Sequence, residues 1–332
     1  MLEASSVLRM LRLAALGLVT CGIIGLATVG SYRPVEKSVA QKTLVVGFSQ
    51  EGAESAWRTA MTDSVKAAAA KRGVDLKFSD AQQKQENQIK ALRTFAAEHV
   101  DVIMFSPVVT TGWTPVLREI KARGIPVIVG DRRPEVDESL YATFIGSDFV
   151  LEGHRAGDWL VKKTGGKAVI AELEGLPGSA PAIDRKKGFT DAISGSPDMK
   201  VIWSQTGNFT RSDGKEAFEA FLKTPEAKQV TVLFAHNDDM ALGAIQAMEE
   251  EGIKPGKDII VVSVDSIKEG LEAVLAGKLN CSVECSPLLG PALFDAADEV
   301  IAGKTIPKRQ VVDETVFDET NVTQAVIDGR KY

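Results

Sequence analysis

The sequence predicts an α/β protein made of two doubly wound lobes, each a parallel sheet with helices on both faces. From Thr43 onward, short runs rich in β-branched residues alternate with longer helical patterns, an order typical of parallel sheets. The same alternation restarts near Tyr141. The chain has 332 residues, which exceeds one ordinary domain and suits two.

The first set of elements is delimited by turn residues. A strand is predicted over 43–48 (TLVVGF), and the helix predicted over 55–72 ends at Gly73, a common residue after a helix C-terminus. The further elements expected in this half are strands over 75–79, 101–106 and 125–129 and helices over 85–99 and 115–123.

The second set has a similar length. Strands are predicted over 141–145, 167–173, 201–205, 231–235, 259–264 and 279–284, and helices over 150–163, 182–193, 214–222, 240–251 and 268–276. No shift in composition marks a flexible linker, so we expect strands to cross directly between the lobes. A helix over 287–301 and a strand over 309–317 exceed the second lobe, and they are expected to return to the first.

Composition and motifs exclude several classes of protein. The net charge of -6 argues against a nucleic-acid binder. The three histidines lack metal-ligand spacing, and the chain has no nucleophile elbow, Walker lysine or dinucleotide-binding turn. Aspartates at strand ends could hold Mg²⁺, but the arginines beside them disfavour it. We therefore predict no catalytic residue, no metal and no cofactor.

The N-terminus has the pattern of an export signal. Arg9 and Arg12 precede an uncharged run over 13–30, and a basic start before an apolar run indicates secretion. The run is long for a signal core and at the lower limit for a membrane span, so an uncleaved anchor is the alternative. Cleavage is expected after Gly30 or Ala40, of which Ala40 is preferred because the first strand begins only at Thr43.

Two cysteines remain once this segment is set aside, Cys281 and Cys285. Residues four apart in an extended strand are separated by roughly 13 Å, too far for a disulfide. We expect two buried or half-buried thiols without a catalytic role.

Polar and aromatic residues follow most of the predicted strands. Ligands of open parallel sheets bind beyond the carboxyl ends of the strands. Carboxylates and amide oxygens accept from sugar hydroxyls, guanidinium groups donate to them, and an aromatic wall suits the apolar face of a sugar ring. Any single such residue could instead cap a helix, and this is the preferred interpretation of Asp238 and Asp239. The predicted ligand-binding residues are Ser49, Glu51, Trp57, Arg58, Asp131, Arg132, Arg185, Phe209, Asn237, Asp265 and Glu284.

The charges of this set nearly balance. Three arginines stand against a similar number of acids, which favours a neutral ligand over a phosphate or a carboxylate. Trp57 could alternatively be a core residue of its helix.

Five segments carry a family resemblance: GFSQEGAESAWR (47–58), QQKQENQIKALRTF (82–95), DRKKGF (184–189), NFTRS (208–212) and AHNDDMALGAIQAM (235–248). From about residue 43 to 303, the chain resembles the type I periplasmic sugar-binding proteins of the ribose/galactose group. Within that group it is similar to the galactofuranose-binding proteins.

The resemblance implies two lobes joined by a three-strand hinge that closes on a neutral monosaccharide, galactofuranose or a related aldose. It also implies delivery of the sugar to an ABC permease in the inner membrane. The N-terminal lobe is then expected over 43–147 with 285–313, and the C-terminal lobe over 148–284 with 314–332, after a leader or anchor with its linker over 1–42.

The resemblance also assigns sugar contacts to the predicted residues. Glu284 occupies a position at which the ribose proteins usually carry glutamine, which suggests a different pattern of hydroxyls. Pro177 and Pro181 depart from the family and could reshape the pocket wall.

Two alternatives remain open. A membrane-tethered or chemoreceptor-linked sugar sensor would have the same lobes. A sugar-responsive transcription regulator shares the core but needs a basic helix-turn-helix at its N-terminus, where this chain has an uncharged run. A monomer is expected.

Overall fold

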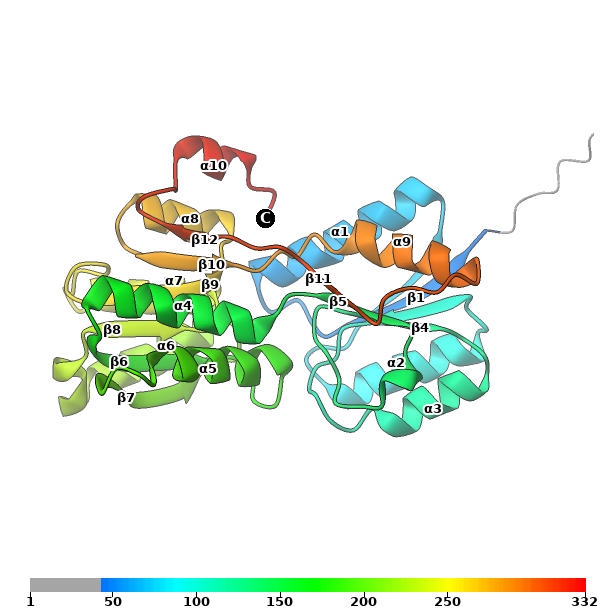
Figure 1. The fold of residues 1–332 in the computed structure, drawn as a ribbon, viewed down its shortest axis with the longest axis horizontal. Helices are drawn as coiled ribbons and strands as arrows, with labels where there is room; N and C mark the ends of the chain where they lie inside the picture. Colours follow the sequence, from blue (N-terminus) through cyan, green and yellow to red (C-terminus); the bar gives the residue numbers. More distant parts are fainter. Residues whose placement is uncertain (1–42) are drawn as a thin grey trace, which may run out of the picture. The chain divides into compact units, whose positions relative to one another are not determined.

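The computed structural model describes residues 43–332, which form one compact unit (Figure 1). The predicted leader or anchor, with both candidate cleavage sites, lies outside the described residues. Within 43–332, none of the helices combines the length and apolar character needed to cross a bilayer.

The unit contains two six-stranded sheets, in agreement with the predicted fold class. The first has the strand order β11-β5-β4-β3-β1-β2 and is parallel throughout. Its lobe comprises β1 (Val45–Gln50), α1 (Ala56–Arg72), β2 (Asp75–Asp80), α2 (Gln85–Ala97), β3 (Val102–Phe105), α3 (Thr114–Ala122), β4 (Val127–Gly130), the 3₁₀ turn η1 (Glu138–Leu140), β5 (Thr143–Gly146), α9 (Gly290–Ile301) and β11 (Arg309–Val311).

Helices cover both faces of this sheet because side chains alternate along each strand. Met104 of β3 packs in one cluster with Met61 of α1 and Phe294 of α9. Its neighbour Phe105 packs in another cluster with the residues of α2 and α3. Both faces are buried, which explains why β3 and β4 are apolar along their whole length.

The second sheet has the order β12-β10-β9-β8-β6-β7. Its lobe comprises α4 (Phe149–Thr164), β6 (Lys167–Glu174), α5 (Ala180–Ile193), β7 (Asp198–Thr206), α6 (Arg211–Leu222), η2 (Pro225–Gln229), β8 (Val232–Ala235), α7 (Asp238–Glu250), β9 (Ile260–Asp265), α8 (Lys268–Leu275), β10 (Cys281–Glu284), β12 (Val316–Asp318) and α10 (Gln324–Gly329). Helices α4 and α5 cover one face, and α6, α7 and α8 cover the other.

The C-terminal region differs from the prediction. The single strand expected over 309–317 is two strands: β11 pairs parallel with β5, and β12 pairs antiparallel with β10. The polar residues Asp313, Glu314 and Thr315 lie between them and carry the chain from one sheet to the other. The helix α10 was not predicted.

The chain crosses between the lobes three times. It passes from β5 to α4 at Ser147, from β10 to α9 through Cys285, and from β11 to β12 through Glu314. Figure 1 shows β11 and β12 joined by an extended segment between the two sheets. The residue limits assigned to each lobe from the sequence stay a prediction.

Candidate functional site

A small cavity lies between the lobes. Both lobes supply its walls, and the ends of β4, β8 and β9 lead into it. The lining residues of the first lobe are Glu54, Ser55, Trp57, Arg58, Asp131 and Arg132; the others are Phe149, Pro181, Arg185, Phe209, Asn237, Asp265 and Cys285.

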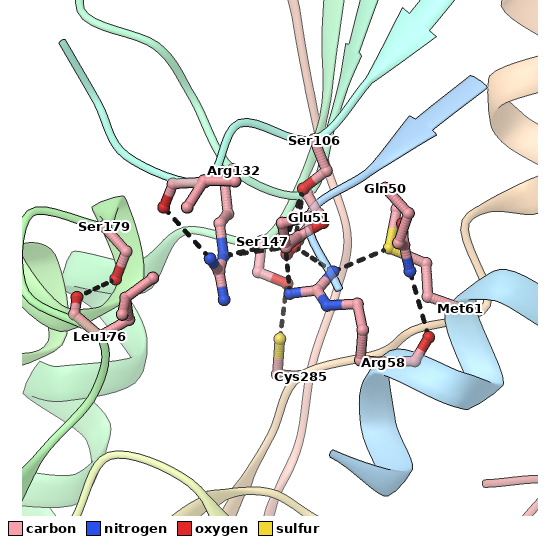
Figure 2. A network of polar contacts seen from close by, with 12 residues as sticks. Gln50, Glu51, Arg58, Met61, Ser106, Arg132, Ser147, Leu176, Ser179 and Cys285 are labelled. Atoms are coloured by element: carbon pink, nitrogen blue, oxygen red, sulfur yellow. Dashed lines mark hydrogen bonds and ion pairs between the residues drawn. The ribbon is translucent and has the colours of Figure 1, made fainter. Parts of the chain in front are cut away.

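Arg58 is the centre of a buried ion-pair network in the first lobe. Its guanidinium lies 2.6 Å from Glu51 Oε1 and 2.7 Å from Asp131 Oδ2. Its Nε donates to Glu54 Oε1 at 3.3 Å. Ser106 Oγ donates to Glu51 from the opposite side at 3.0 Å (Figure 2). The arginine therefore holds three acids in fixed positions beside the cavity.

Arg132 reaches from the first lobe toward the second. Its Nε lies 3.1 Å from Glu51 Oε1, and its guanidinium carbon lies 5.3 Å from the centre of the Phe209 ring. Such a cation–π contact is favourable within about 6 Å. Arg132 and Phe209 thus form a contact between the lobes in the wall of the cavity.

Arg185 organises the second lobe's side of the cavity. Its Nε donates to Glu152 Oε2 at 2.7 Å, and its Nη1 donates to the backbone oxygen of His236 at 2.5 Å. Asp265 Oδ1 lies 3.5 Å from its Nη2. Helix α5, which carries Arg185, packs closely against α4. A Cβ added at Gly153 of α4 would lie only 2.2 Å from the Arg185 carbonyl oxygen, so glycine is needed there.

Strained backbone gathers at the cavity. Asp131, Phe209 and Asp265 have φ values of 59°, 64° and 117°. Non-glycine residues rarely adopt this left-handed region, and such strain is concentrated at functional sites. Gly146 lies beside Asp131, whose carbonyl oxygen would be 2.7 Å from an added Cβ.

Asn237 is both a helix cap and a lining residue. Its Oδ1 accepts from the Met240 amide at the start of α7, and its Nδ2 donates to the Phe209 carbonyl. The interpretation of Asp238 and Asp239 as the caps of this helix was therefore wrong. Asp238 instead accepts from the Ile267 amide, at 2.8 Å.

Burial and neighbouring charges shift the pKa values of the acids at the site. Burial raises the pKa of Glu51 to about 7, against the opposing effect of Arg58 and Arg132. Burial also raises the pKa values of Glu152 and Asp265. The lining arginines are matched by three lining acids, Glu54 among them, so the cavity has no surplus positive charge for an anionic ligand.

Glu54 provides an unused acceptor at the cavity. Its Oε2 is buried without a hydrogen-bond partner among the described residues. A buried acceptor without a donor is costly, and a hydroxyl of a bound molecule would supply that donor. Glu54 was missing from the predicted residues, although the strand-end rule points to the loop that contains it.

The structure brings eight predicted residues together at the cavity: Trp57, Arg58, Asp131, Arg132, Arg185, Phe209, Asn237 and Asp265. Ser49 and Glu51 are completely buried and are not among the lining residues. Trp57 belongs to the core cluster and also lines the cavity, and its Nε1 donates to the Cys285 carbonyl at 2.6 Å.

Glu284, which belongs to the predicted set, is not among the lining residues. Its carboxylate accepts from the Tyr332 hydroxyl and the Thr315 amide, each at 3.1 Å, and pairs with Arg330. These partners belong to the C-terminal segment, whose path was not predicted.

The lining residues that sequence reasoning missed, besides Glu54, are Ser55, Phe149 and Cys285; Pro181 was noted only as a departure from the family.

The three crossings meet at a buried acidic cluster beside the cavity. One carboxylate oxygen each of Glu152 and Glu314 and the Sγ of Cys285 lie within 4.8 Å of one another. The Ser147 hydroxyl donates to Glu314. The same hydroxyl lies 3.5 Å from Cys285 Sγ (Figure 2). Burial and Glu152 raise the pKa of Glu314 to about 9, so a proton neutralises this carboxyl. Cys281 and Cys285 are both buried free thiols.

The fold and the cavity define a class: two α/β lobes, connected three times, with a ligand cavity between them. The chain belongs to the periplasmic binding protein domain family, whose model matches residues 46–305. It is 47% identical over 291 residues to the galactofuranose-binding protein YtfQ of Escherichia coli (strain K12), covering 87% of this chain and 92% of that protein.

Two solved structures are similar at a TM-score of 0.84. One is the periplasmic binding protein component of the arabinose ABC transporter from Shewanella sp. ANA-3, bound to α- and β-L-arabinofuranose; it is 49% identical, over 86% of this chain and 95% of that one. The other, from Mycobacterium smegmatis in complex with β-D-fucofuranose, is 51% identical, over 87% and 96%.

Proposed function

We propose that this protein is the periplasmic substrate-binding component of an ABC sugar importer and that it binds a neutral monosaccharide between its lobes. The observation that carries the proposal is the small cavity whose lining charges are matched within the protein. Arginine and carboxylate side chains hold one another there, and their remaining donors and acceptors suit hydroxyl groups.

The proposed sugar contacts combine rings and polar groups. Trp57 and Phe209 offer aromatic surfaces, while Arg132, Arg185 and the free oxygen of Glu54 offer hydrogen bonds. An apolar ring face against an aromatic wall, with polar groups around the rim, is typical of small-molecule sites. The other proposed contacts are Arg58, Asp131, Asn237 and Asp265. Ser49 and Glu51 would support the site from beneath, and Glu284 is not included.

The relatives favour a sugar in its five-membered ring form. The three relatives described above are named for, or bound to, galactofuranose, arabinofuranose and fucofuranose. These sugars are uncharged, as the balanced cavity requires. We therefore propose galactofuranose, or an aldose that presents a similar furanose ring, as the ligand.

Binding is proposed to select the closed form of the protein. The cavity exists only where both lobes face each other, and Arg132 of one lobe lies against Phe209 of the other. A ligand that touches both lobes binds the closed form better than the open form and shifts the population toward it. The crossings at Ser147, Cys285 and Glu314 would act as the hinge.

A ligand screen tests the proposal. Thermal unfolding would be followed with D-galactose, L-arabinose, D-fucose and D-ribose, and with galacturonate as a charged control of similar shape. A ligand at 100 times its Kd stabilises the folded state by about 2.7 kcal/mol. Carbon-13 spectra of [1-¹³C]galactose would then identify the bound ring form.

Stabilisation by a neutral sugar, compaction in small-angle scattering and a bound furanose signal are the expected results. Stabilisation by galacturonate alone would contradict the neutral-ligand proposal. We further propose that the protein carries out no chemistry on the sugar, acts as a monomer and delivers the sugar to an inner-membrane permease. Light scattering and sugar recovered unchanged after incubation would test the first two points.

A further inference from the structure

We propose that Asp239 is a positioning residue for sugar binding, which holds the lobes closed through a direct contact that does not involve the sugar. The inference rests on the proposed function, because it concerns how the same cavity is closed. It assigns to Asp239 a part of the binding affinity although Asp239 is not among the residues that line the cavity.

The contact joins the starts of two helices from opposite lobes. Asp239 Oδ2 accepts from the backbone amide of Ala56 at 3.0 Å. Ala56 is the first residue of α1, and Asp239 lies in the first turn of α7. Ser55 and Trp57, on either side of Ala56, line the cavity. The hydrogen bond therefore seals the cavity at its edge.

The chemistry of a helix start favours this contact. The first amides of a helix have no acceptor within the helix, and the N-terminus carries partial positive charge that attracts a carboxylate. The Ser55 hydroxyl already caps α1 by accepting from the Arg58 amide. The Ala56 amide is left for an acceptor from elsewhere, and in the closed form that acceptor is Asp239.

Asp239 is available for this role because α7 does not use it as a cap. Asn237 caps α7 instead. The other oxygen of Asp239 is held by Arg211 of the same lobe, with Nε at 3.1 Å and Nη2 at 2.9 Å. Arg211 in turn pairs with Glu269, also of that lobe, at 2.7 Å. These partners fix the carboxylate whether the lobes are open or closed, and only the bond to Ala56 depends on closure.

Other contacts among the described residues also join the lobes. Arg309 of β11 pairs with Asp148, the N-cap of α4, at 2.7 Å, beside the crossing at Ser147. Thr110 donates from its backbone amide to the Gly178 carbonyl at 2.9 Å. Both atoms of this last contact belong to the backbone, so only a proline at position 110 would remove its donor. Asp239 is thus a position beside the cavity at which a direct closing contact can be deleted without changing a lining residue.

The consequence is a specific kinetic effect. A contact made only in the closed form lowers the free energy of that form, so its loss weakens sugar binding without changing any sugar contact. Escape of the sugar requires opening, so the dissociation rate should rise. Entry of the sugar into the open form does not involve Asp239, so the association rate should stay near that of the wild type.

The test compares Asp239→Ala, Asp239→Asn and the control Glu269→Gln. The control removes the other acidic partner of Arg211 and leaves the bond to Ala56 in place. Titration calorimetry and stopped-flow measurements would use D-galactose and L-arabinose, and thermal unfolding without sugar would report on folding. A charge-assisted hydrogen bond of this kind predicts an affinity about tenfold weaker in Asp239→Ala.

The dissociation rate should be about tenfold faster in Asp239→Ala. It should change less in Asp239→Asn, because asparagine keeps an acceptor oxygen. The Kd of Glu269→Gln should stay within about twofold of that of the wild type. A folded Asp239→Ala protein with wild-type Kd would overturn the inference. So would an equal loss in Glu269→Gln, or a slower association rate as the whole effect. Failure of the wild type to bind any of the sugars would instead overturn the proposed function, and this inference with it.

Discussion

The half-buried side chain of Glu314, at a crossing between the lobes, should make the stability of the protein depend on pH in an unusual direction. Burial and the neighbouring Glu152 raise the pKa of Glu314 to about 9, from an ordinary value of 4.5. Between these two values the folded protein holds a proton that the unfolded chain has released. Stability therefore falls as pH rises across this window, the opposite of the usual behaviour of a salt-bridged carboxylate.

The magnitude follows from the single proton involved. One proton bound in the folded state alone changes the free energy of unfolding by about 1.4 kcal/mol per pH unit. Between pH 6 and pH 8, which both lie inside the window, the wild type should lose about 2.7 kcal/mol through this group. Glu314→Gln keeps a neutral, hydrogen-bonding side chain at the crossing. Because glutamine does not titrate, the free energy of unfolding of this variant should not fall through this group.

The assay is urea unfolding of the wild type and of Glu314→Gln at pH 6, 7 and 8. Glu51 and Asp238 have pKa values raised by burial to about 7 and about 6, so both proteins will also share a background dependence. The difference between the two proteins reports the titration of Glu314 together with its effect on the neighbouring Glu152. Asp313→Asn removes an exposed carboxylate from the adjacent position and serves as the control. A difference between wild type and Glu314→Gln that stays constant from pH 6 to pH 8 would refute the reasoning.

Three further predictions follow from the site and its support. Arg132→Ala should weaken sugar binding by roughly 2–4 kcal/mol, because Glu51 loses one of its two guanidinium partners and the cavity loses a charged donor. Calorimetry that shows an unchanged Kd would contradict the site. Gly153→Ala should lower the free energy of unfolding by about 1–3 kcal/mol, since its Cβ would lie 2.2 Å from a backbone oxygen of α5. The control Gly195→Ala, whose Cβ would meet no atom within 4 Å, should leave the free energy of unfolding unchanged, and thermal unfolding of both variants tests this difference. Glu284→Gln should keep the wild-type Kd within about twofold, whereas Asp265→Asn in the cavity wall should weaken binding at least tenfold; equal losses by calorimetry would restore Glu284 to the site.

Most of the fold could be predicted because hydrophobic patterning and turn residues agree. Buried central strands such as β3 and β4 are continuous apolar runs, and helices such as α1 end at a glycine in the left-handed conformation. The C-terminal region could not be predicted in the same way. The run over 309–317 has strand composition throughout, and only tertiary pairing decides that β11 and β12 belong to different sheets.

The site could be predicted to the extent that it follows one topological rule. Asp131, Asn237 and Asp265 lie at or just after the carboxyl ends of β4, β8 and β9. The two sheets direct these ends toward the space between the lobes, so the meeting of the three residues follows from the fold. Phe149 and Cys285 could not be found in this way, because they lie where the chain crosses between lobes. Glu284 is also the last residue of a strand, but that strand, β10, pairs with β12 on one side. The C-terminal segment that includes β12 supplies the partners of the Glu284 carboxylate.

The buried charges of the cavity explain how an uncharged ligand can be held by ionic side chains. Isolated buried ions would be strongly destabilising, and pairing offsets only part of that cost. Here Arg58 and Arg185 are fixed by acids of their own lobes, so their desolvation occurs when the lobes fold rather than when the sugar binds. Side chains immobilised in advance lose little further freedom on binding. Each lobe therefore presents a rigid array of donors and acceptors, and the free energy of closure depends on the sugar's hydroxyls and on the few direct contacts between lobes, such as that of Asp239 with Ala56.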